Sequence, residues 1–256
     1  TNKSDADIFK ARPTLSLLWA NSLATTGPLV QSLFEMITPD VIEAVAREHE
    51  AGRKLLVGAV NLDTGAFETF DLTELASQFS NAPEQTRSCY VAALTASAAQ
   101  PLAFPPTFIN DAMYTDGGVR QTVFITNLHE ALDQHVEQIK NRNGGDAPNF
   151  DISVIMNTDL RVDPQIKPGS KVNNRLPAIL ERTLPIVVDQ TDQNGLELIQ
   201  AASKLNPNID MRWTSARGHK CSQFDDDPVN KEFKPKKMAC LIRYGDEGIW
   251  EGTAWQ

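Results

Sequence analysis

Residues 96–119 of this 256-residue chain read ASAAQPLAFPPTFINDAMYTDGGV, and this stretch decides the fold. A run of small residues predicts the end of a helix, which stops at Pro101 because proline cannot continue a helix. The Phe-Pro-Pro segment that follows restricts the backbone, and residues 107–114 are expected to form a short hairpin. The hairpin carries Asp116 into a turn of two glycines. Glycines permit positive φ angles and place no side chain beside the carboxylate, so Asp116 can be aimed at a neighbouring hydroxyl.

Upstream of this stretch, helices alternate with strands of the buried type. Residues 38–40 (Thr-Pro-Asp) predict the start of a helix that Gly52 ends, and its inner face is formed by Val41, Ile42, Val45 and Ala46. Residues 54–62 form a continuous apolar run, which is typical of a strand buried on both faces in a parallel sheet covered by helices. After a turn at residues 63–65, residues 66–70 return as a strand. Residues 83–99 predict a helix whose small side chains place it centrally.

Downstream, the same alternation continues. An amphipathic helix is expected over residues 127–140 and an exposed loop over residues 141–148. Further strands are expected at residues 150–156 and 209–214, with a helix over residues 176–205 that Pro185 breaks or kinks. Helical spacing from Met238 to Ile249 predicts a C-terminal helix. The fold class is therefore α/β, a mostly parallel sheet flanked by helices, and we expect one domain over residues 1–256.

The parts of residues 96–119 resemble patatin-like phospholipases in their order and spacing. In that family, a helix ending in small residues leads to a Pro-x-x-Phe-Pro-Pro-like segment, and a hairpin then leads to Asp-Gly-Gly or Asp-Gly-Ala. This sequence matches with Pro101, Phe104, Pro105, Pro106 and Asp116-Gly117-Gly118. The resemblance extends more loosely to residues 54–63 and to residues 241–255, so it covers most of the chain as the C-terminal part of the family's domain.

The resemblance implies a patatin-like modified α/β-hydrolase fold and a lipid acyl hydrolase, a phospholipase A or carboxylic ester hydrolase. The family uses a Ser–Asp dyad, in which the aspartate accepts the proton of a serine nucleophile in a Gly-x-Ser-x-Gly elbow. Asp116 would be this general base, and Gly117 and Gly118 would serve geometry. We expect a lipid or ester substrate, no cofactor and no metal.

The sequence departs from the family in one large respect, because no Gly-x-Ser-x-Gly and no glycine-rich oxyanion loop occurs in it. The adjacent glycine pairs are Gly117-Gly118 and Gly144-Gly145. We therefore expect the N-terminal strand and the nucleophile elbow to precede Thr1, as an attached or separate segment. Two alternatives stay open: a non-catalytic patatin-derived domain that binds lipid or a protein, and an unrelated α/β hydrolase or transferase with its own site. Ser97 is a weaker candidate nucleophile, since a helix among alanines predicts a packing role.

Composition excludes some classes of function. The net charge is −9 and the pI about 5.0, which argues against nucleic acid as the main partner because phosphate backbones attract basic surfaces. No apolar run is long enough for a transmembrane segment. The three cysteines fit no metal spacing, and we expect residues 225–227 (Asp-Asp-Asp) beside His219 and Cys221 to form a solvated loop. Cys89 is expected to be a core thiol. A Cys221–Cys240 disulfide is possible if the protein is exported, so the compartment stays open.

Overall fold

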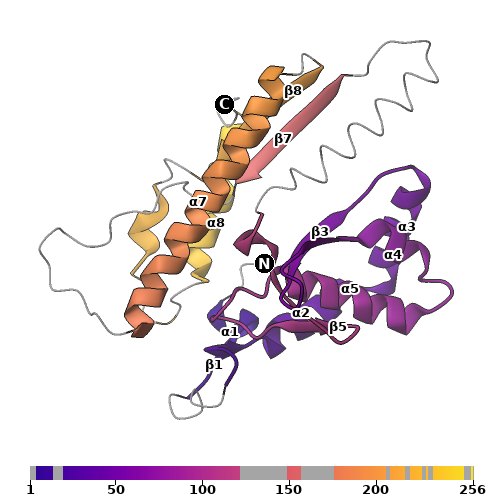
Figure 1. Cartoon of the computed structure of the whole chain (residues 1–256), viewed down its shortest axis with the longest axis horizontal. Helices are drawn as coiled ribbons and strands as arrows, with labels where there is room; N and C mark the ends of the chain where they lie inside the picture. The colour runs from indigo at the N-terminus through magenta and orange to yellow at the C-terminus, as the bar shows by residue number, and fades with distance from the viewer. Residues whose placement is uncertain are drawn as a thin grey trace, which may run out of the picture. The chain divides into compact units, whose positions relative to one another are not determined.

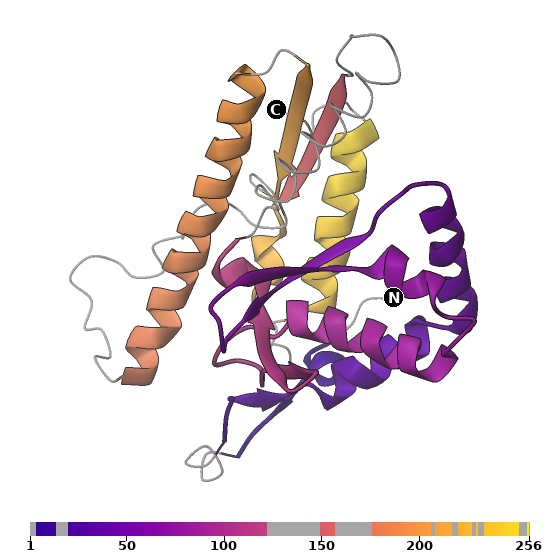
Figure 2. The same ribbon diagram turned by 45° about the vertical axis from the view of Figure 1, so that its right-hand side comes forward.

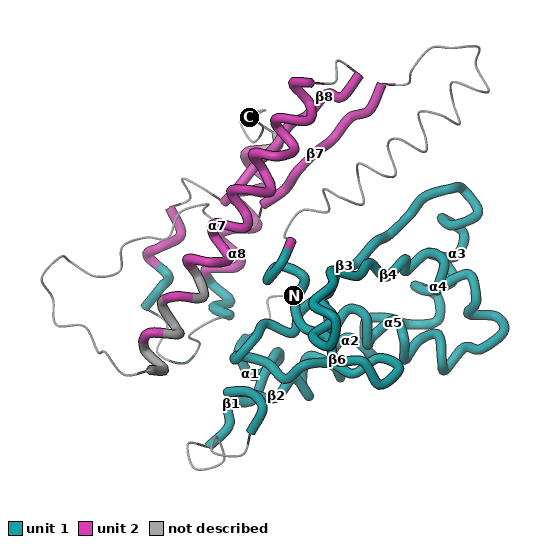
Figure 3. The backbone as a smooth tube through the Cα atoms, in the orientation of Figure 1, with its two compact units in different colours: residues 1–120, 224–236 teal, residues 121–223, 237–256 magenta. Residues whose placement is uncertain are grey.

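The computed structural model describes residues 4–13, 20–121, 149–156, 176–205, 208–216, 220–226, 229, 233–250 and 255. The chain divides into two compact units (Figure 3), the first made of Thr1–Arg120 with Phe224–Lys236 and the second of Gln121–Gln223 with Lys237–Gln256. Two units can belong to one domain, so a single domain over residues 1–256 stays a prediction. The predicted helix over residues 127–140 and the loop after it lie outside the described residues, as does Gly144-Gly145.

The centre of unit 1 is a four-stranded antiparallel sheet in the order β4-β3-β6-β5. Its strands are β3 (Leu56–Asn61), β4 (Phe67–Asp71), β5 (Thr107–Ile109) and β6 (Ala112–Asp116). The strands and both hairpins were predicted, but a parallel setting for β3 is wrong. Its last four residues are buried, as the apolar run indicated. A strand that is buried on both faces can have parallel or antiparallel neighbours. Here β3 pairs antiparallel with β4, its own hairpin partner, and with β6 of the β5–β6 hairpin.

Helix α5 (Pro83–Ser97) confirms the predicted central helix. Its small residue Ala96 packs in one buried cluster with Ala59 and Tyr114 of the sheet. Further along, Tyr90 and Ala93 join a second cluster with Ile42 of α3 (Pro39–Glu50) and with Leu72 and Ala76 of α4 (Leu72–Ser77). The start of α3 was predicted correctly. Val41 is 38% exposed, so its assignment to the inner face is wrong, whereas Ile42 is buried.

The remaining elements of unit 1 are α1 (Asp5–Ile8), the strand pair β1 (Lys10–Ala11) and β2 (Ala24–Thr25), and α2 (Gly27–Met36). Phe233, although far along the chain, belongs to this unit, where its N–H donates to Asp5 Oδ1 at 2.6 Å. Phe9 lies between the rings of Phe233 and Phe104, with centroids 6.3 Å and 5.9 Å away. The phenylalanine of the Phe-Pro-Pro segment is thereby packed against the N-terminal part of the unit.

Unit 2 is built on two parallel strands, β7 (Phe150–Met156) and β8 (Ile209–Ser215), which lie beside α7 (Leu176–Leu205) in Figures 1 and 2. Both strands and their parallel direction agree with the α/β prediction. Val154 and Met156 pack on Leu196 and Ile199 of α7, whereas Ile155 is 72% exposed, so β7 is buried on one face. Helix α7 runs through Pro185 as one element, so the predicted break is wrong, whereas a kink at Pro185 stays a prediction. The C-terminal helix is confirmed as α8 (Pro235–Trp250).

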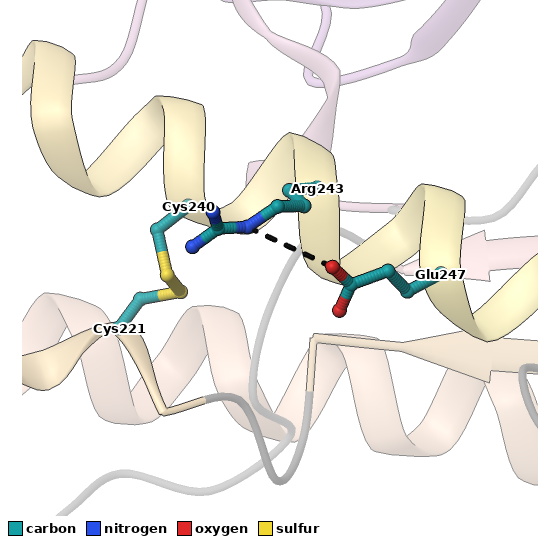
Figure 4. The surroundings of a disulfide bond; sticks show 4 residues. All are labelled: Cys221, Cys240, Arg243 and Glu247. Atoms are coloured by element: carbon teal, nitrogen blue, oxygen red, sulfur yellow. Dashed lines mark ion pairs between the residues drawn. A yellow bond between two sulfur atoms is a disulfide. The ribbon is translucent and has the colours of Figure 1, made fainter.

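A disulfide joins Cys221, at the start of the short 3-10 helix η3 (Cys221–Phe224), to Cys240 of α8 (Figure 4). The sequence left open whether these two cysteines form a disulfide, and in the structure they do. Beside it, Arg243 and Glu247 form an ion pair of 3.8 Å along α8. Cys89 is a free thiol that is half-buried on α5.

We expect Asp71→Ala to lower the free energy of unfolding by about 1 kcal/mol, the usual cost of losing an N-cap. Asp71 caps α4, since its Oδ1 accepts from the N–H groups of Thr73 and Glu74, both at 3.0 Å. Burial raises the pKa of Asp71, but the hydrogen bonds and Lys54, 3.0 Å from Oδ2, outweigh burial and lower the pKa to about 2.

Because the folded pKa is depressed, the stabilisation is present above the ordinary value of 3.8 and is lost as the pH falls toward about 2. Urea unfolding of Asp71→Ala at pH 7 and at low pH measures it. Asparagine caps helices nearly as well as aspartate, so Asp71→Asn is the matched control and should cost less. Equal losses in both variants would contradict a capping role.

Candidate active site

A tight hairpin delivers Asp116 to the centre of the sheet. Asn110 and Asp111 connect β5 to β6 with φ angles of 49° and 65°, the two positive values that a two-residue hairpin turn requires. The turn fixes the register of β6, which pairs with β3 so that Asp116 lies opposite Ala59. Asp116 is therefore the last residue of β6, at the point where the strand leaves the sheet.

The end of α5 anchors this end of β6. The Ala99 carbonyl accepts two hydrogen bonds, from the Asp116 N–H at 3.0 Å and from Thr115 Oγ1 at 2.6 Å. Ala99 is 1% exposed, so these contacts lie in the protein interior, where hydrogen bonds are strong. The small residues before Pro101 thus have a positional role, because they let the helix end approach β6 closely. The sequence analysis missed Thr115, although a buried threonine hydroxyl beside a candidate catalytic residue must find an acceptor.

Asp116 is half-buried, and one of its two carboxylate oxygens accepts a backbone hydrogen bond. Oδ1 accepts the Gly118 N–H at 2.8 Å, and within the described part of the chain the structure gives Oδ2 no hydrogen bond. Burial raises the pKa of Asp116, and the Gly118 N–H opposes this effect. A carboxylate with a raised pKa is a stronger base than an ordinary aspartate, which suits proton abstraction from a hydroxyl.

The two glycines after Asp116 act differently from the prediction. They lie in the short 3-10 turn η2 (Gly117–Val119), and positive φ angles occur at Gly52 and Gly65 rather than at Gly117 or Gly118. The requirement at Gly117 is steric, since an added Cβ would lie 2.6 Å from the Gly58 carbonyl oxygen. Gly118 contributes the backbone N–H that holds Asp116. The glycines were predicted to shape the backbone around Asp116 through positive φ angles. The physical reason at Gly117 is instead the close approach of the β3 backbone, which leaves no room for a side chain.

Those other sequence candidates that the structure describes have packing or pairing roles. Ser97 is half-buried in the last turn of α5, as a packing residue would be. Cys221 is bound in the disulfide, and Asp225 forms an ion pair of 3.9 Å with Lys234. Over the described residues, no cluster of three or more histidine, cysteine or acidic side chains could hold a metal ion. His219 lies outside the described residues.

Unit 1 thus places an aspartate at the end of β6, directly before a Gly-Gly turn, in a sheet that packs against α5. The family model described as patatin-like phospholipase matches residues 2–129, which is half of the chain. The chain therefore belongs to the patatin-like phospholipase family. Membership implies an α/β hydrolase-like fold and, in general terms, lipid acyl hydrolase activity.

The match covers the N-terminal half of the chain, including the Asp-Gly-Gly motif. It does not extend to residues 241–255, so the looser resemblance expected there is not confirmed. A search of curated proteins found no match. In the described residues, no helix is both long and apolar enough to cross a membrane.

Proposed function

We propose that this chain supplies Asp116 as the general base of a Ser–Asp dyad in a lipid acyl hydrolase that cleaves phospholipids or other carboxylic esters. The serine is proposed to lie in a Gly-x-Ser-x-Gly segment that precedes Thr1. In the reaction, Asp116 Oδ2 accepts the proton of the serine hydroxyl as the serine oxygen attacks the ester carbonyl; the ester C–O bond then breaks, the departing alcohol takes that proton from Asp116, and the acyl group stays on the serine. Water then attacks the acyl-enzyme and gives a proton to the regenerated carboxylate, which returns it to the serine oxygen as the free acid leaves.

The observation that carries the proposal is the state of the Asp116 carboxylate. One oxygen is held by the Gly118 N–H, which orients the group, and the strand is anchored at Ala99. Oδ2 remains for a hydroxyl from outside the described residues. A general base must lie within hydrogen-bond reach of its proton and have a pKa suited to the task, and burial shifts the pKa of Asp116 upward, the direction that makes the carboxylate a stronger base.

A second candidate is a non-catalytic domain of the same family that binds lipid or a protein partner. What favours it is the lack of a Gly-x-Ser-x-Gly sequence among the 256 residues. The two candidates differ in whether an activated serine exists in the native protein.

A fluorophosphonate probe, which reacts covalently with activated serines, separates the two. The native protein is treated with the probe, digested, and the adduct is located by mass spectrometry. We expect labelling of a serine that precedes Thr1. Labelling of a serine inside this chain, such as Ser97, would contradict the proposed site. If the folded protein shows no labelling, the dyad proposal fails and the binding role is the better description.

A further inference from the structure

Consecutive residues of β6 are each held by a contact beyond the pairing of the strands. The Met113 N–H donates to Asp63 Oδ2 at 2.9 Å, and the Tyr114 hydroxyl donates to Glu68 Oε2 at 2.6 Å. The next two residues donate to the Ala99 carbonyl, as described above. Each residue from Met113 to Asp116 is therefore held by a hydrogen bond to a group outside its hairpin partner β5.

The bond between Tyr114 and Glu68 joins two strands that do not pair with each other. Glu68 belongs to β4 and Tyr114 to β6, and β3 lies between them. Neighbouring strands are about 4.8 Å apart, so the two side chains bridge roughly 9.6 Å across β3. Ala59 of β3 lies opposite both Glu68 and Asp116, and its fully buried methyl group leaves room for the bridge.

The sheet register places these side chains on one face together with Asp116. Ala59 and Asn61 are two residues apart on β3, and their partners on β6 are Asp116 and Tyr114. Residues two apart along a strand point to the same face. Glu68, as the β4 partner of Ala59, shares that face. Glu68, Ala59 and Asp116 therefore form one row across the sheet, and Tyr114 and Asn61 lie in the next row.

Asn61 completes the connection. Its Nδ2 donates to Glu68 Oε1 at 2.8 Å, so both oxygens of the Glu68 carboxylate are bound. Its Oδ1 accepts the N–H groups of Asp63 and Thr64, at 3.0 Å and 3.2 Å, which orders the turn between β3 and β4. Asn61 and Tyr114 are both buried. Buried polar groups are costly unless every partner is present, so such a network favours one arrangement of the three strands over slipped ones.

We infer that Asn61, Glu68 and Tyr114 form a positioning network for Asp116, a bridge across β3 that fixes the end of β6. The inference rests on the proposed function, since it assigns these residues a role in placing the general base. None of the three contacts the reacting atoms. Loss of the Tyr114 hydroxyl would free β6 from β4 while leaving the Ala99 anchor, so the carboxylate would be displaced by a fraction of an ångström. Displacements of about 1 Å can cost 100-fold in rate, so a smaller shift should cost about tenfold.

The experiment compares Tyr114→Phe, Glu68→Met, which removes both acceptor oxygens, and the double variant in the native protein. Each is assayed with a soluble short-chain ester and by its rate of fluorophosphonate labelling. We expect kcat and the labelling rate to fall about tenfold in each single variant with KM little changed, because the network touches no substrate. The double variant should lose no more than Glu68→Met alone, since both substitutions remove the Tyr114–Glu68 bond.

The matched control is Tyr90→Phe, the same substitution at a buried tyrosine on α5 that is not part of the network. It should keep full kcat. If Tyr114→Phe lowers only the melting temperature, or if KM rises and kcat does not fall, the network is merely structural and the inference is wrong. If instead the wild-type protein neither hydrolyses esters nor reacts with the probe, the proposed function itself has failed.

Discussion

Asp116→Asn should lower kcat for ester hydrolysis by at least about 100-fold, the lower range of what a general base contributes. Asparagine keeps the shape of the side chain, and its Oδ1 can still accept the Gly118 N–H that Asp116 accepts at 2.8 Å. It cannot accept a proton from a hydroxyl. The fluorophosphonate labelling rate should fall with kcat, because the probe reacts with the same activated serine. Kinetics with a soluble ester and timed labelling measure both effects.

The fold should survive this substitution. Burial raises the pKa of Asp116, so the ionised carboxylate costs folding free energy above that raised pKa. Asp116→Asn removes this cost, and at neutral pH the variant should be at least as stable as wild type. The difference should shrink as the pH falls and the wild-type carboxyl becomes protonated. For the same reason, wild-type activity should be lost on acidification at a pH above the ordinary aspartate value of 3.8.

The matched control is Asp111→Asn, the same change in the exposed turn of the same hairpin. Asp111 has a φ of 65°, a conformation that asparagine also tolerates, so the hairpin should form normally. Asp111→Asn should therefore keep full activity. An Asp116→Asn variant that is folded and as active as Asp111→Asn would remove Asp116 from the mechanism and favour an unrelated site.

The sequence was sufficient to predict the local elements around Asp116, because their signals are local. Pro101 follows the end of α5 at Ser97, and the small residues of α5 indicate close packing. Aspartate and glycine residues form the turn between β3 and β4. The direction of β3 could not be obtained this way. A continuous apolar run reports burial on both faces, and here an antiparallel sheet provides that burial for residues 58–61.

Contacts between residues far apart in sequence explain what the sequence did not predict. Gly117 is required by the backbone of Gly58 on a neighbouring strand, whereas a glycine pair considered alone suggests positive φ angles. Tyr114 and Glu68 are 46 residues apart, and their bond depends on the register that places Ala59 between β4 and β6. Neither a spacing rule nor a motif contains that register. The place of Asp116 at the end of a hairpin strand was therefore predictable, and the contacts that support it were not.

Loss of the disulfide has the largest expected effect on stability. The Cys221–Cys240 bond spans 19 residues, and closing a loop of that size restricts the unfolded chain by about 3 kcal/mol at 25 °C. Cys221 is 1% exposed, so its removal also disturbs a packed position. The double variant Cys221→Ala with Cys240→Ala should lower the free energy of unfolding by about 2–4 kcal/mol. Urea unfolding of the intact protein, with hydrogen exchange followed in peptides of α8, measures the loss and its location.

Reductant supplies the internal control for this prediction. A dithiol should destabilise the wild type to nearly the level of the double variant and should leave the double variant unchanged. Cys89→Ser, at a free thiol on α5, should retain the full effect of reductant. Alkylation of the untreated native protein should modify Cys89 alone. Modification of all three cysteines would show that the bond is absent from the native protein. An intact bond would indicate that the protein matures where disulfides form, which the sequence alone left open.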